Sequence, residues 1–253
     1  MKGPIFIGGM MKSGTSLLRV LISNHPNIYG GLETHWFNSD ILINFKDHNS
    51  PRIKLLRELY DVDESDFINL QQCSTSGIDF FNNFMIYCAE RANKKRWVEK
   101  TTDNIFHLPL IKKTWPSAKF IHVIRDHRDI YASWKKNNKL DLAQFIINVK
   151  RIKEIIPDYK ELNNKFYMEI NYLDIILDTT NSLKKIFEHM DEPWVEGLDN
   201  YGGDSFAYDK ILETTNKVSP TALSLRKPIF QTSIGRWKNI LSAEEIQAIE
   251  KEM

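Results

Sequence analysis

Residues 5–22 read IFIGGMMKSGTSLLRVLI, a short apolar run followed by glycines and a second apolar run. Residues 5–7 have the length of a buried strand, and residues 16–22 have the pattern of an amphipathic helix. Between them, Gly8-Gly9 favours a turn. The stretch therefore predicts a strand, a glycine loop and a helix, in that order.

Strands and helices alternate along the rest of the chain. Further strands are predicted at residues 97–99, 119–124 and 166–170. Helices are predicted at residues 105–115, with an early interruption at Pro109, at 129–136 and at 183–190. This order predicts an α/β fold in which one parallel sheet is flanked by helices on both faces. No change in composition divides the chain, so we expect residues 1–253 to form a single domain.

Two further segments have a less regular pattern. Residues 41–96 are polar with a helical period, and Ser50-Pro51 and residues 74–77 break them into several helices that we expect to pack over the sheet. Residues 219–237 are rich in Ser, Thr and Pro and show little periodicity. A capping box at residues 242–245 predicts a final helix after them.

The composition is that of a globular protein with balanced charge. The chain has 34 Lys and Arg against 33 Asp and Glu, a net charge of +1, and 42% of its residues are hydrophobic. This balance argues against nucleic acid as the main partner. Cys73 and Cys88 are too few for a disulfide framework and lack the spacing of a zinc site. From these cysteines we expect a protein of the reducing cytoplasm that holds no metal. The first apolar run is too short for a signal peptide or a membrane span, so we also expect no membrane span.

The glycine loop after the first predicted strand has most of a phosphate-binding motif. Gly9 and Gly14 are separated by four residues, as in G-x-x-x-x-G-K-S/T, and Ser16 holds the hydroxyl position. Thr15 stands where nucleoside triphosphatases have lysine, and the lysine of this loop is Lys12, at its centre. Because the usual lysine reaches the terminal phosphates of a triphosphate, its displacement predicts a different ligand.

The loop can still bind an anion. The backbone amides of residues 13–16 lie at the start of the predicted helix, whose positive end attracts a compact tetrahedral anion. Lys12 would then reach the oxygen that bridges this anion to a second one, where negative charge builds as the bond between them breaks. The alternative is an ordinary glycine turn with a solvated lysine.

Two motifs resemble those of the sulfotransferases that use 3′-phosphoadenosine-5′-phosphosulfate (PAPS). Residues 12–18, KSGTSLL, resemble the loop that binds the 5′-phosphosulfate, and residues 124–133, IRDHRDIYAS, resemble the motif that binds the 3′-phosphate. The layout is most similar to the tyrosylprotein-sulfotransferase-like and bacterial branch. The resemblance implies a P-loop-like fold, PAPS as co-substrate, 3′-phosphoadenosine-5′-phosphate (PAP) as product, and no metal.

The resemblance also implies which residues bind the nucleotide. They are Lys12, Ser13, Gly14, Thr15, Ser16, Arg125, Ser133, Tyr172 and Arg236. Arg125 follows a buried strand, where a guanidinium can bind a phosphate through two hydrogen bonds, and Ser133 lies two helical turns further on. The alternative for Arg125 is an ion pair with Asp126 or Asp129.

The last two of these residues lie in the second half of the chain. Tyr172 follows the strand predicted at residues 166–170 and resembles a tyrosine that helps to bind adenine. Its alternative is a half-buried core aromatic. Residues 227–237 are similar to the segment that closes over the nucleotide, and Arg236 lies where that segment contacts it.

Sulfuryl transfer to a hydroxyl needs a base that removes the proton of that hydroxyl. The cytosolic branch uses a histidine two residues after a lysine, and this chain has Thr102 there, after Lys100. In the tyrosylprotein branch the base is a glutamate, and Glu33 stands at a similar distance from the loop. His35 is the rival base, since its ordinary pKa suits the role better. On a strand, the side chains of Glu33 and His35 would face the same side. The other alternative for Glu33 is an ordinary acid at the surface.

Two more catalytic residues follow from the resemblance. Lys100 matches a lysine that stabilises the transferring group, and Thr221 aligns with a serine of the same role. The expected partner is a hydroxyl-bearing acceptor, namely a sugar, a small molecule or a peptide tyrosine. We expect residues 41–96, which the resemblance leaves unmatched, to form a helical insertion covering the acceptor side. Whether the protein forms a homodimer stays open.

Two other functions stay open on the sequence alone. A small-molecule kinase of the same fold would need Mg²⁺, and the chain lacks an evident magnesium aspartate at a strand end. A non-catalytic nucleotide-binding module would bind PAP and transfer nothing.

Overall fold

The computed structural model describes residues 2–37, 39–136, 141–160 and 165–253. Within these ranges, five parallel strands form one sheet in the order β2-β3-β1-β4-β5. Their bounds are β1 Ile5–Gly8, β2 Ile28–Gly30, β3 Arg96–Lys100, β4 Lys119–Ile124 and β5 Tyr167–Asn171. In the register, Phe6 of β1 lies opposite Glu99 of β3 and Phe120 of β4, so β1 is the central strand.

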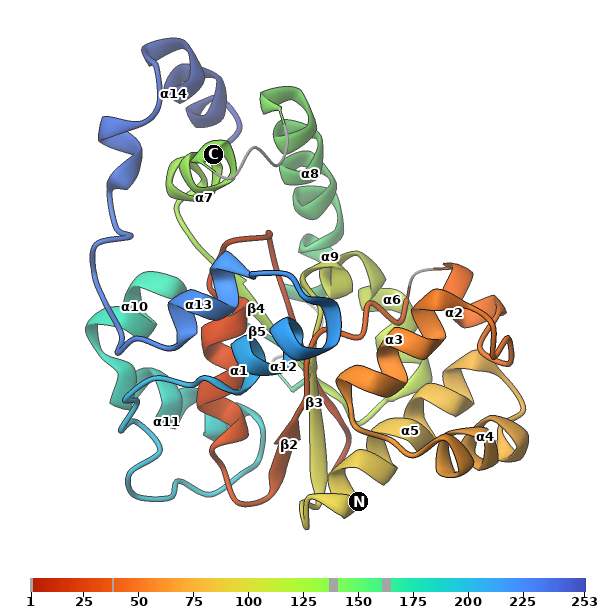
Figure 1. Ribbon diagram of the computed structural model, residues 1–253. Helices are drawn as coiled ribbons and strands as arrows, with labels where there is room; N and C mark the ends of the chain where they lie inside the picture. Colours follow the sequence, from red (N-terminus) through yellow and green to blue (C-terminus); the bar gives the residue numbers. More distant parts are fainter. Residues whose placement is uncertain (1, 38, 137–140, 161–164) are drawn as a thin grey trace.

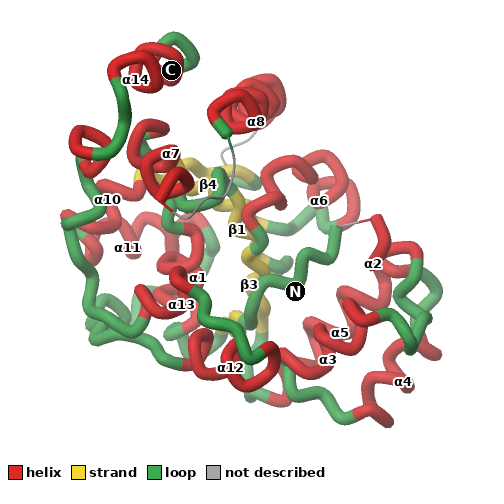
Figure 2. Tube along the Cα trace, turned by 45° about the horizontal axis from the view of Figure 1, so that its top comes forward, coloured by secondary structure: helices red, strands yellow, loops and turns green. Residues whose placement is uncertain are grey.

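Helices cover both faces of this sheet (Figure 1). One face carries α1 (Thr15–Ser23), α10 (Tyr172–Leu177) and α11 (Thr179–His189). The other carries the 3-10 helix η1 (Thr102–His107), α6 (Leu108–Thr114), α5 (Gly77–Arg91) and the helices beside it, α2 (Ser39–Ile43), α3 (Pro51–Leu59) and α4 (Glu64–Cys73). Figure 2, which views the sheet along its edge, shows the two groups separated by the strands. The predicted α/β fold is confirmed.

The remaining helices lie towards one edge of the sheet or above its end. They are α7 (His127–Lys136), α8 (Leu142–Ile155), α9 (Pro157–Lys160), α12 (Phe206–Thr215), α13 (Pro220–Leu225), the 3-10 helix η2 (Arg236–Asn239) and α14 (Ala243–Glu250). The capping box predicted at the last helix is present, between Ser242 and Glu245. None of the helices in the described ranges combines the length and the apolarity that crossing a membrane requires.

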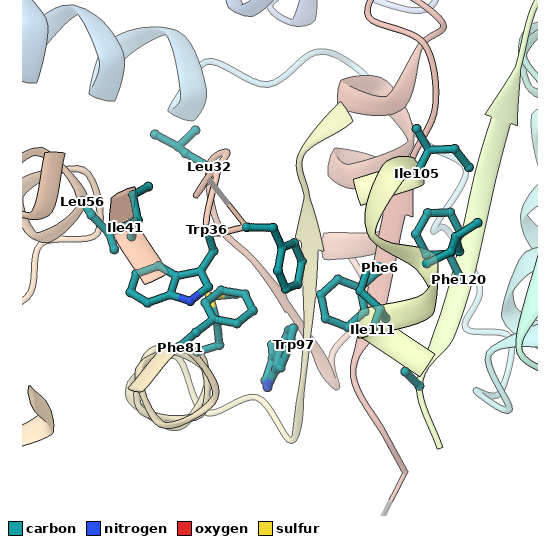
Figure 3. Packing of buried hydrophobic residues seen from close by; sticks show 14 of the residues in the cluster. Phe6, Leu32, Trp36, Ile41, Leu56, Phe81, Trp97, Ile105, Ile111 and Phe120 are labelled. Atoms are coloured by element: carbon teal, nitrogen blue, oxygen red, sulfur yellow. The ribbon is translucent and has the colours of Figure 1, made fainter. Parts of the chain in front are cut away.

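The core has two parts because the side chains of a strand alternate between the two faces of its sheet. Ile5, Ile7 and Val98 point to the α1 face. Phe6 and Trp97 point to the opposite face, where their rings meet edge to face at 5.4 Å between centroids. Figure 3 shows this aromatic side of the core. The edge-to-face geometry is the favoured one for aromatic pairs, so the large rings fix the position of β1 and β3.

Several elements differ from the sequence-based prediction. Pro109 does not interrupt a helix: it lies in the first turn of α6, where its missing amide hydrogen costs nothing. The stretch before it forms η1. β2, α8 and α12 were not predicted, and residues 220–225 of the irregular tail form α13.

The arrangement of the strands determines where a ligand can bind. The chain leaves β1 to build β2 and β3 on one side of it, and later adds β4 and β5 on the other. In open parallel sheets ligands bind beyond the carboxyl ends of the strands, where the order of strands reverses direction. The glycine loop after β1 lies at this point.

Candidate active site

The glycine loop, residues 9–14, has a conformation that depends on Gly14. Gly14 has φ +106°, and a Cβ there would lie 2.2 Å from Cδ2 of Tyr172. Only glycine combines this backbone conformation with such close contact. At the start of the loop, the amide of Gly9 donates to the carbonyl oxygen of Thr102 at 3.1 Å. The glycines seen in the sequence are therefore required by the turn itself.

The amides after the loop are those expected of an anion site. The first hydrogen bond within α1 joins Leu18 N to Gly14 O at 3.2 Å. Amides that precede this bond have no acceptor within the helix. Ser13 differs from the rest, because its amide donates to Met10 O at 3.0 Å and its side chain is fully buried, away from the cleft. The donors available to an anion are therefore those of Gly14, Thr15, Ser16 and Leu17.

Arg125 follows β4 and ties the loop to the tail. Its guanidinium donates to the carbonyl oxygens of Lys12, at 2.9 Å, and Ser233, at 2.6 Å. The same group lies over the ring of Tyr172, 4.4 Å from its centroid, and the Tyr172 hydroxyl is 3.0 Å from Ser233 Oγ. A guanidinium has five N–H donors, so this role leaves donors for a ligand.

The ion pair considered for Arg125 does not form. Asp126 instead pairs with Arg128 at 2.7 Å. The buried carboxylate of Asp129 accepts hydrogen bonds from the amides of Gly235, at 2.8 Å, and Trp237, at 3.3 Å. Both acids are thereby occupied with other partners, and Arg125 faces the cleft.

The loop opens into a cleft of about 670 Å³. Its lining is rich in cations, even though the charge of the whole chain is balanced. They are Lys12, Arg19, Arg52, Lys100, Arg125, Lys136, Lys227 and Arg236, against the carboxylates of Glu33 and Asp103. Such a concentration of one charge in a cleft attracts anionic ligands.

Two arginines in the cleft are in an unfavourable state without an anion. Burial lowers the pKa of Arg125, and the nearby charge of Arg236 lowers that pKa further. The Nε atom of Arg236 is buried and has no hydrogen-bond partner among the described residues. A bound phosphate would supply both the opposite charge and the missing acceptor. The site therefore fits a nucleotide that carries a phosphate at this position.

A second cluster surrounds Lys100 at the end of β3. Lys100 Nζ donates to Ser16 Oγ at 2.9 Å and forms an ion pair with Glu33. The other carboxylate oxygen of Glu33 lies 3.1 Å from Nε2 of His35. Glu33 and His35 do not lie on a strand, because both lie in the loop after β2. They nevertheless line the cleft together.

The electrostatics of Glu33 reflect these neighbours. Burial alone would raise the pKa of Glu33, but the charge of Lys100 and the contact with His35 outweigh burial. The pKa of Glu33 is thus held well below its ordinary value. Glu33 is consequently ionised in the ligand-free protein, which a group that accepts a proton requires.

The cation at the centre of the loop meets the tail. Lys12 Nζ donates to Thr221 Oγ1, in the first turn of α13, at 2.6 Å.

Tyr172 is largely buried and packs in the core, and it also lines the cleft. The two alternatives considered for Tyr172 therefore do not exclude each other.

The structure brings almost all of the sequence-based candidates into one cleft. Ser133 lines it, and so does Lys136, one helical turn further on the same face of α7. Lys136 was missed, although its spacing from Ser133 was a usable signal. Arg52 was also missed, because nothing in the sequence indicates that α3 lies beside the glycine loop. Ser13 is the candidate whose side chain does not reach the cleft.

Comparison with known sequences gives a consistent result. The family model described as "Sulfotransferase family" matches residues 4–196. Protein-tyrosine sulfotransferase A of Caenorhabditis elegans is 26% identical over 206 residues, which cover 75% of this chain and 50% of that protein. The protein-tyrosine sulfotransferase of Drosophila melanogaster is 22% identical over 247 residues, covering 92% and 46%. The chain therefore spans about half the length of these two relatives.

Solved structures share the fold. The sulfotransferase domain from the Synechococcus PCC 7002 olefin synthase has a TM-score of 0.70 at 20% identity, covering 99% of this chain and 95% of that one. Mouse sulfotransferase SULT7A1, complexed with PAP, has a TM-score of 0.54 at 16% identity, covering 100% and 83%. The family match includes the glycine loop, Glu33, Lys100 and Arg125, whereas Thr221 and Arg236 lie beyond its end. Because the match extends over most of the chain, this protein belongs to the sulfotransferase family, as the two motifs predicted.

Proposed function

We propose that this sulfotransferase moves the sulfuryl group of PAPS to a hydroxyl acceptor by in-line transfer. The bond between sulfur and the bridging phosphate oxygen breaks, and a bond forms between sulfur and the acceptor oxygen. The acceptor proton passes to Glu33, and the electron pair of the broken bond stays on the phosphate of PAP. The reaction balances without a metal or a redox partner.

The contacts around the glycine loop carry this proposal. Lys12 and Lys100 are held at the loop by hydrogen bonds to Thr221 and Ser16, and Lys100 also contacts Glu33. Two cations beside a helix N-terminus can stabilise the negative charge that develops on a departing phosphate. A carboxylate in contact with one of these cations is then close enough to take a proton from the attacking hydroxyl.

The other end of the cleft would bind the rest of the nucleotide. Arg125, Ser133 and Arg236 are the proposed ligands of the 3′-phosphate, with Lys136 as an additional cation. The Nε of Arg236, which has no hydrogen-bond partner in the described part of the chain, supports this assignment. The guanidinium of Arg125 already lies over the ring of Tyr172. Tyr172 would therefore contact the adenosine at the part of its ring that Arg125 does not cover.

The low pKa of Glu33 has to change before Glu33 can act well as a base. In the ligand-free protein Lys100 forms an ion pair with Glu33 and makes it a weak base. The negative charge of bound PAPS would attract Lys100 and repel the carboxylate, and both effects raise the pKa of Glu33. Nucleotide binding would thereby activate the base.

The acceptor side is lined by apolar residues next to Glu33. Leu32, Leu59, Ala207 and Ile211 come from the loop after β2, from α3 and from α12. An apolar lining favours a hydroxyl carried by an apolar or aromatic body, such as a phenolic small molecule or a peptide tyrosine, over a bare sugar. The relatives from Caenorhabditis elegans and Drosophila melanogaster are named as protein-tyrosine sulfotransferases, which supports including peptide tyrosine among the acceptors to be tested.

The direct test is transfer of labelled sulfate from PAPS to a panel of phenolic small molecules, tyrosine peptides and sugars. We expect sulfated product with at least one phenolic acceptor, and the amount of this product should not change when EDTA is added. The Lys12→Met variant is the matched control and should give none. Tight binding of PAP without transfer to any acceptor would contradict the proposed sulfuryl transfer and favour a non-catalytic binding module. Phosphoryl transfer from ATP that needs Mg²⁺ would favour a kinase.

A further inference from the structure

Residues 31–37, which carry Glu33 and His35, form neither helix nor strand. His35 has φ +50°, a conformation that is costly for a residue with a side chain. A base must nevertheless be held close to its working position, because a displacement of about 1 Å can cost roughly 10²-fold in rate. The loop therefore needs an anchor outside itself.

Three consecutive residues at the end of β3 provide contacts to this loop. Lys100 holds Glu33 on the α1 face of the sheet. Its neighbour Glu99 points to the opposite face and accepts hydrogen bonds from Thr34, through the amide at 3.2 Å and through the hydroxyl at 2.9 Å. Because neighbouring strand residues face opposite ways, the loop is held from both sides of β3.

The third residue completes the attachment. Thr101 Oγ1 accepts a hydrogen bond from the amide of His35 at 3.1 Å and donates to Glu99 Oε1 at 2.7 Å. Asn104 Nδ2 donates to the other oxygen of Glu99 at 2.6 Å. Glu99 is thus the common partner of the loop and of the first residues after β3.

The chemistry of Glu99 is specific to this task. Its side chain is buried, with an exposed fraction of 1%, and no Lys, Arg or His of the described residues forms an ion pair with it. A buried carboxylate without a cation is costly unless hydrogen bonds satisfy it. Here four donors do so, two of them from Thr34. Three of these donors share Oε1, so a glutamine could keep them only by turning its NH2 group towards Nδ2 of Asn104. That nitrogen is itself a donor and is held in this orientation by its hydrogen bond to Ile7 O.

We infer that Glu99 is a positioning residue of the transfer reaction: through Thr34 and Thr101 it fixes the loop that holds Glu33 beside Lys100. It acts through its neighbours and does not line the cleft itself. The inference rests on the proposed function as far as the role of Glu33 is concerned. The attachment of the loop to Glu99 stands on geometry alone.

The first test compares two buried glutamates by the same substitution. Glu192 is buried like Glu99 and accepts hydrogen bonds from Arg96 and Asn27, at the opposite end of the sheet. We expect Glu99→Gln to lower kcat about 10- to 100-fold while the Kd for PAP changes less than about 2-fold. Glu192→Gln should lower the melting temperature but leave kcat unchanged. Equal kcat values for the two variants would overturn the inference.

The pH profile separates positioning from general loss of structure. The charged and titratable groups that face Glu33 are Lys100 of β3, Arg52 of α3, Arg19 of α1 and His35 of its own loop. If Glu99→Gln releases the loop, Glu33 moves away from Lys100 and the acid limb of kcat/KM moves to higher pH. An unmoved acid limb, together with unchanged kcat, counts against a positioning role.

A measurement that needs no activity tests the attachment itself. Hydrogen exchange should show that Glu99→Gln loses protection at residues 31–36 and retains it in β1 and α1, whereas a merely structural role would weaken protection throughout the sheet. If wild type transfers no sulfuryl group, the proposed function fails but this readout still decides whether Glu99 holds the loop. Should Glu99→Gln not fold, Thr34→Val removes the same hydroxyl contact, and intact protection and full kcat in Thr34→Val would overturn the inference.

Discussion

Glu33 takes the proton in the proposed reaction, and His35, the rival base, lies in contact with it at 3.1 Å. Glu33→Gln keeps the shape of the side chain and removes its basicity. We expect kcat to fall about 10²- to 10⁴-fold, the usual worth of a general base, with no change in the Kd for PAP. Steady-state kinetics and calorimetry with PAP measure the two quantities.

His35→Asn is the matched variant for this experiment. It removes the contact to Glu33 but leaves Lys100 in place, so kcat should fall by less than about 10-fold. A larger fall in His35→Asn than in Glu33→Gln would transfer the role of base to His35. The neighbouring residues of the loop would then position a histidine.

Arg125 is expected to act mainly in nucleotide binding. Arg125→Gln loses a charged hydrogen bond to the 3′-phosphate, worth about 1.5–3 kcal/mol, which corresponds to a 10- to 150-fold weaker Kd for PAP. Arg128→Gln is the control, because Arg128 is three residues away, pairs with Asp126 and Glu250, and does not line the cleft. Calorimetric titration with PAP measures both. Equal affinities in the two variants would contradict the assignment.

The sequence predicted those site residues that lie in motifs or at strand ends. Lys12 and Lys100 are of this kind, since the end of a parallel strand can be located from its apolar run. Arg52 could not be predicted, because its place in the cleft depends on how α3 packs. Ser13 was expected to contact the ligand, but the turn of the loop directs its side chain inward, which a motif does not show.

At the scale of elements, α7 holds the tail over the nucleotide end of the cleft. Asp129, in the first turn of α7, accepts hydrogen bonds from the amides of Gly235 and Trp237, on both sides of Arg236. Asp129→Asn leaves one acceptor oxygen for two donors. We expect PAP to bind about 5- to 30-fold more weakly, roughly 1–2 kcal/mol, with kcat little changed at saturating PAPS.

Two measurements check the role of α7. Calorimetry gives the Kd for PAP, and limited proteolysis in the presence of PAP reports whether residues 228–240 are cleaved faster in Asp129→Asn. Lys135→Gln, which breaks an exposed ion pair between α7 and Glu245, should have little effect on either. If Asp129→Asn bound PAP like wild type, the tail would not depend on α7.

The elements that the sequence missed share a physical cause. β2 has three residues, too few for an alternating pattern to be visible, and it forms because β3 offers a free edge. α8 and α12 carry mixed polar and apolar residues, and their burial depends on partners far away in the sequence. β1 and β4 were predicted because both of their faces are covered, which gives largely apolar runs.

At the scale of the whole molecule, buried and half-buried histidines should make stability depend on pH. Burial lowers the pKa of His25, His107, His122 and His127 below the ordinary value near 6.5. The unfolded chain then binds more protons than the folded one as pH falls below about 6.5, so each of these histidines favours unfolding. We expect the free energy of unfolding to decrease from pH 7.5 to pH 5.5, as measured by urea denaturation.

A second loss of stability is expected at lower pH. Burial would raise the pKa of Glu169, but the nearby His122, at 3.6 Å, and the contacts from Lys160 and Tyr167 outweigh burial and lower the pKa to about 2. A carboxylate with a lowered pKa stabilises the folded state above its unfolded value, and this contribution disappears between about pH 4.5 and pH 2. Because the two losses of stability fall in different pH ranges, the contribution of the histidines can be measured separately from that of Glu169.

His127→Phe tests the histidine window with a single residue. His127 Nδ1 is buried without a hydrogen-bond partner among the described residues, and its ring meets Phe145 edge to face at 6.2 Å, so a phenyl ring can replace the imidazole. One titrating proton contributes a slope of at most about 1.4 kcal/mol per pH unit. His127→Phe should therefore be less sensitive to pH than wild type between pH 6.5 and pH 5.5, and as stable or more stable at pH 5.5. A slope equal to that of wild type would mean that His127 titrates alike in the folded and unfolded chain, and the pH dependence would then rest on the other three histidines.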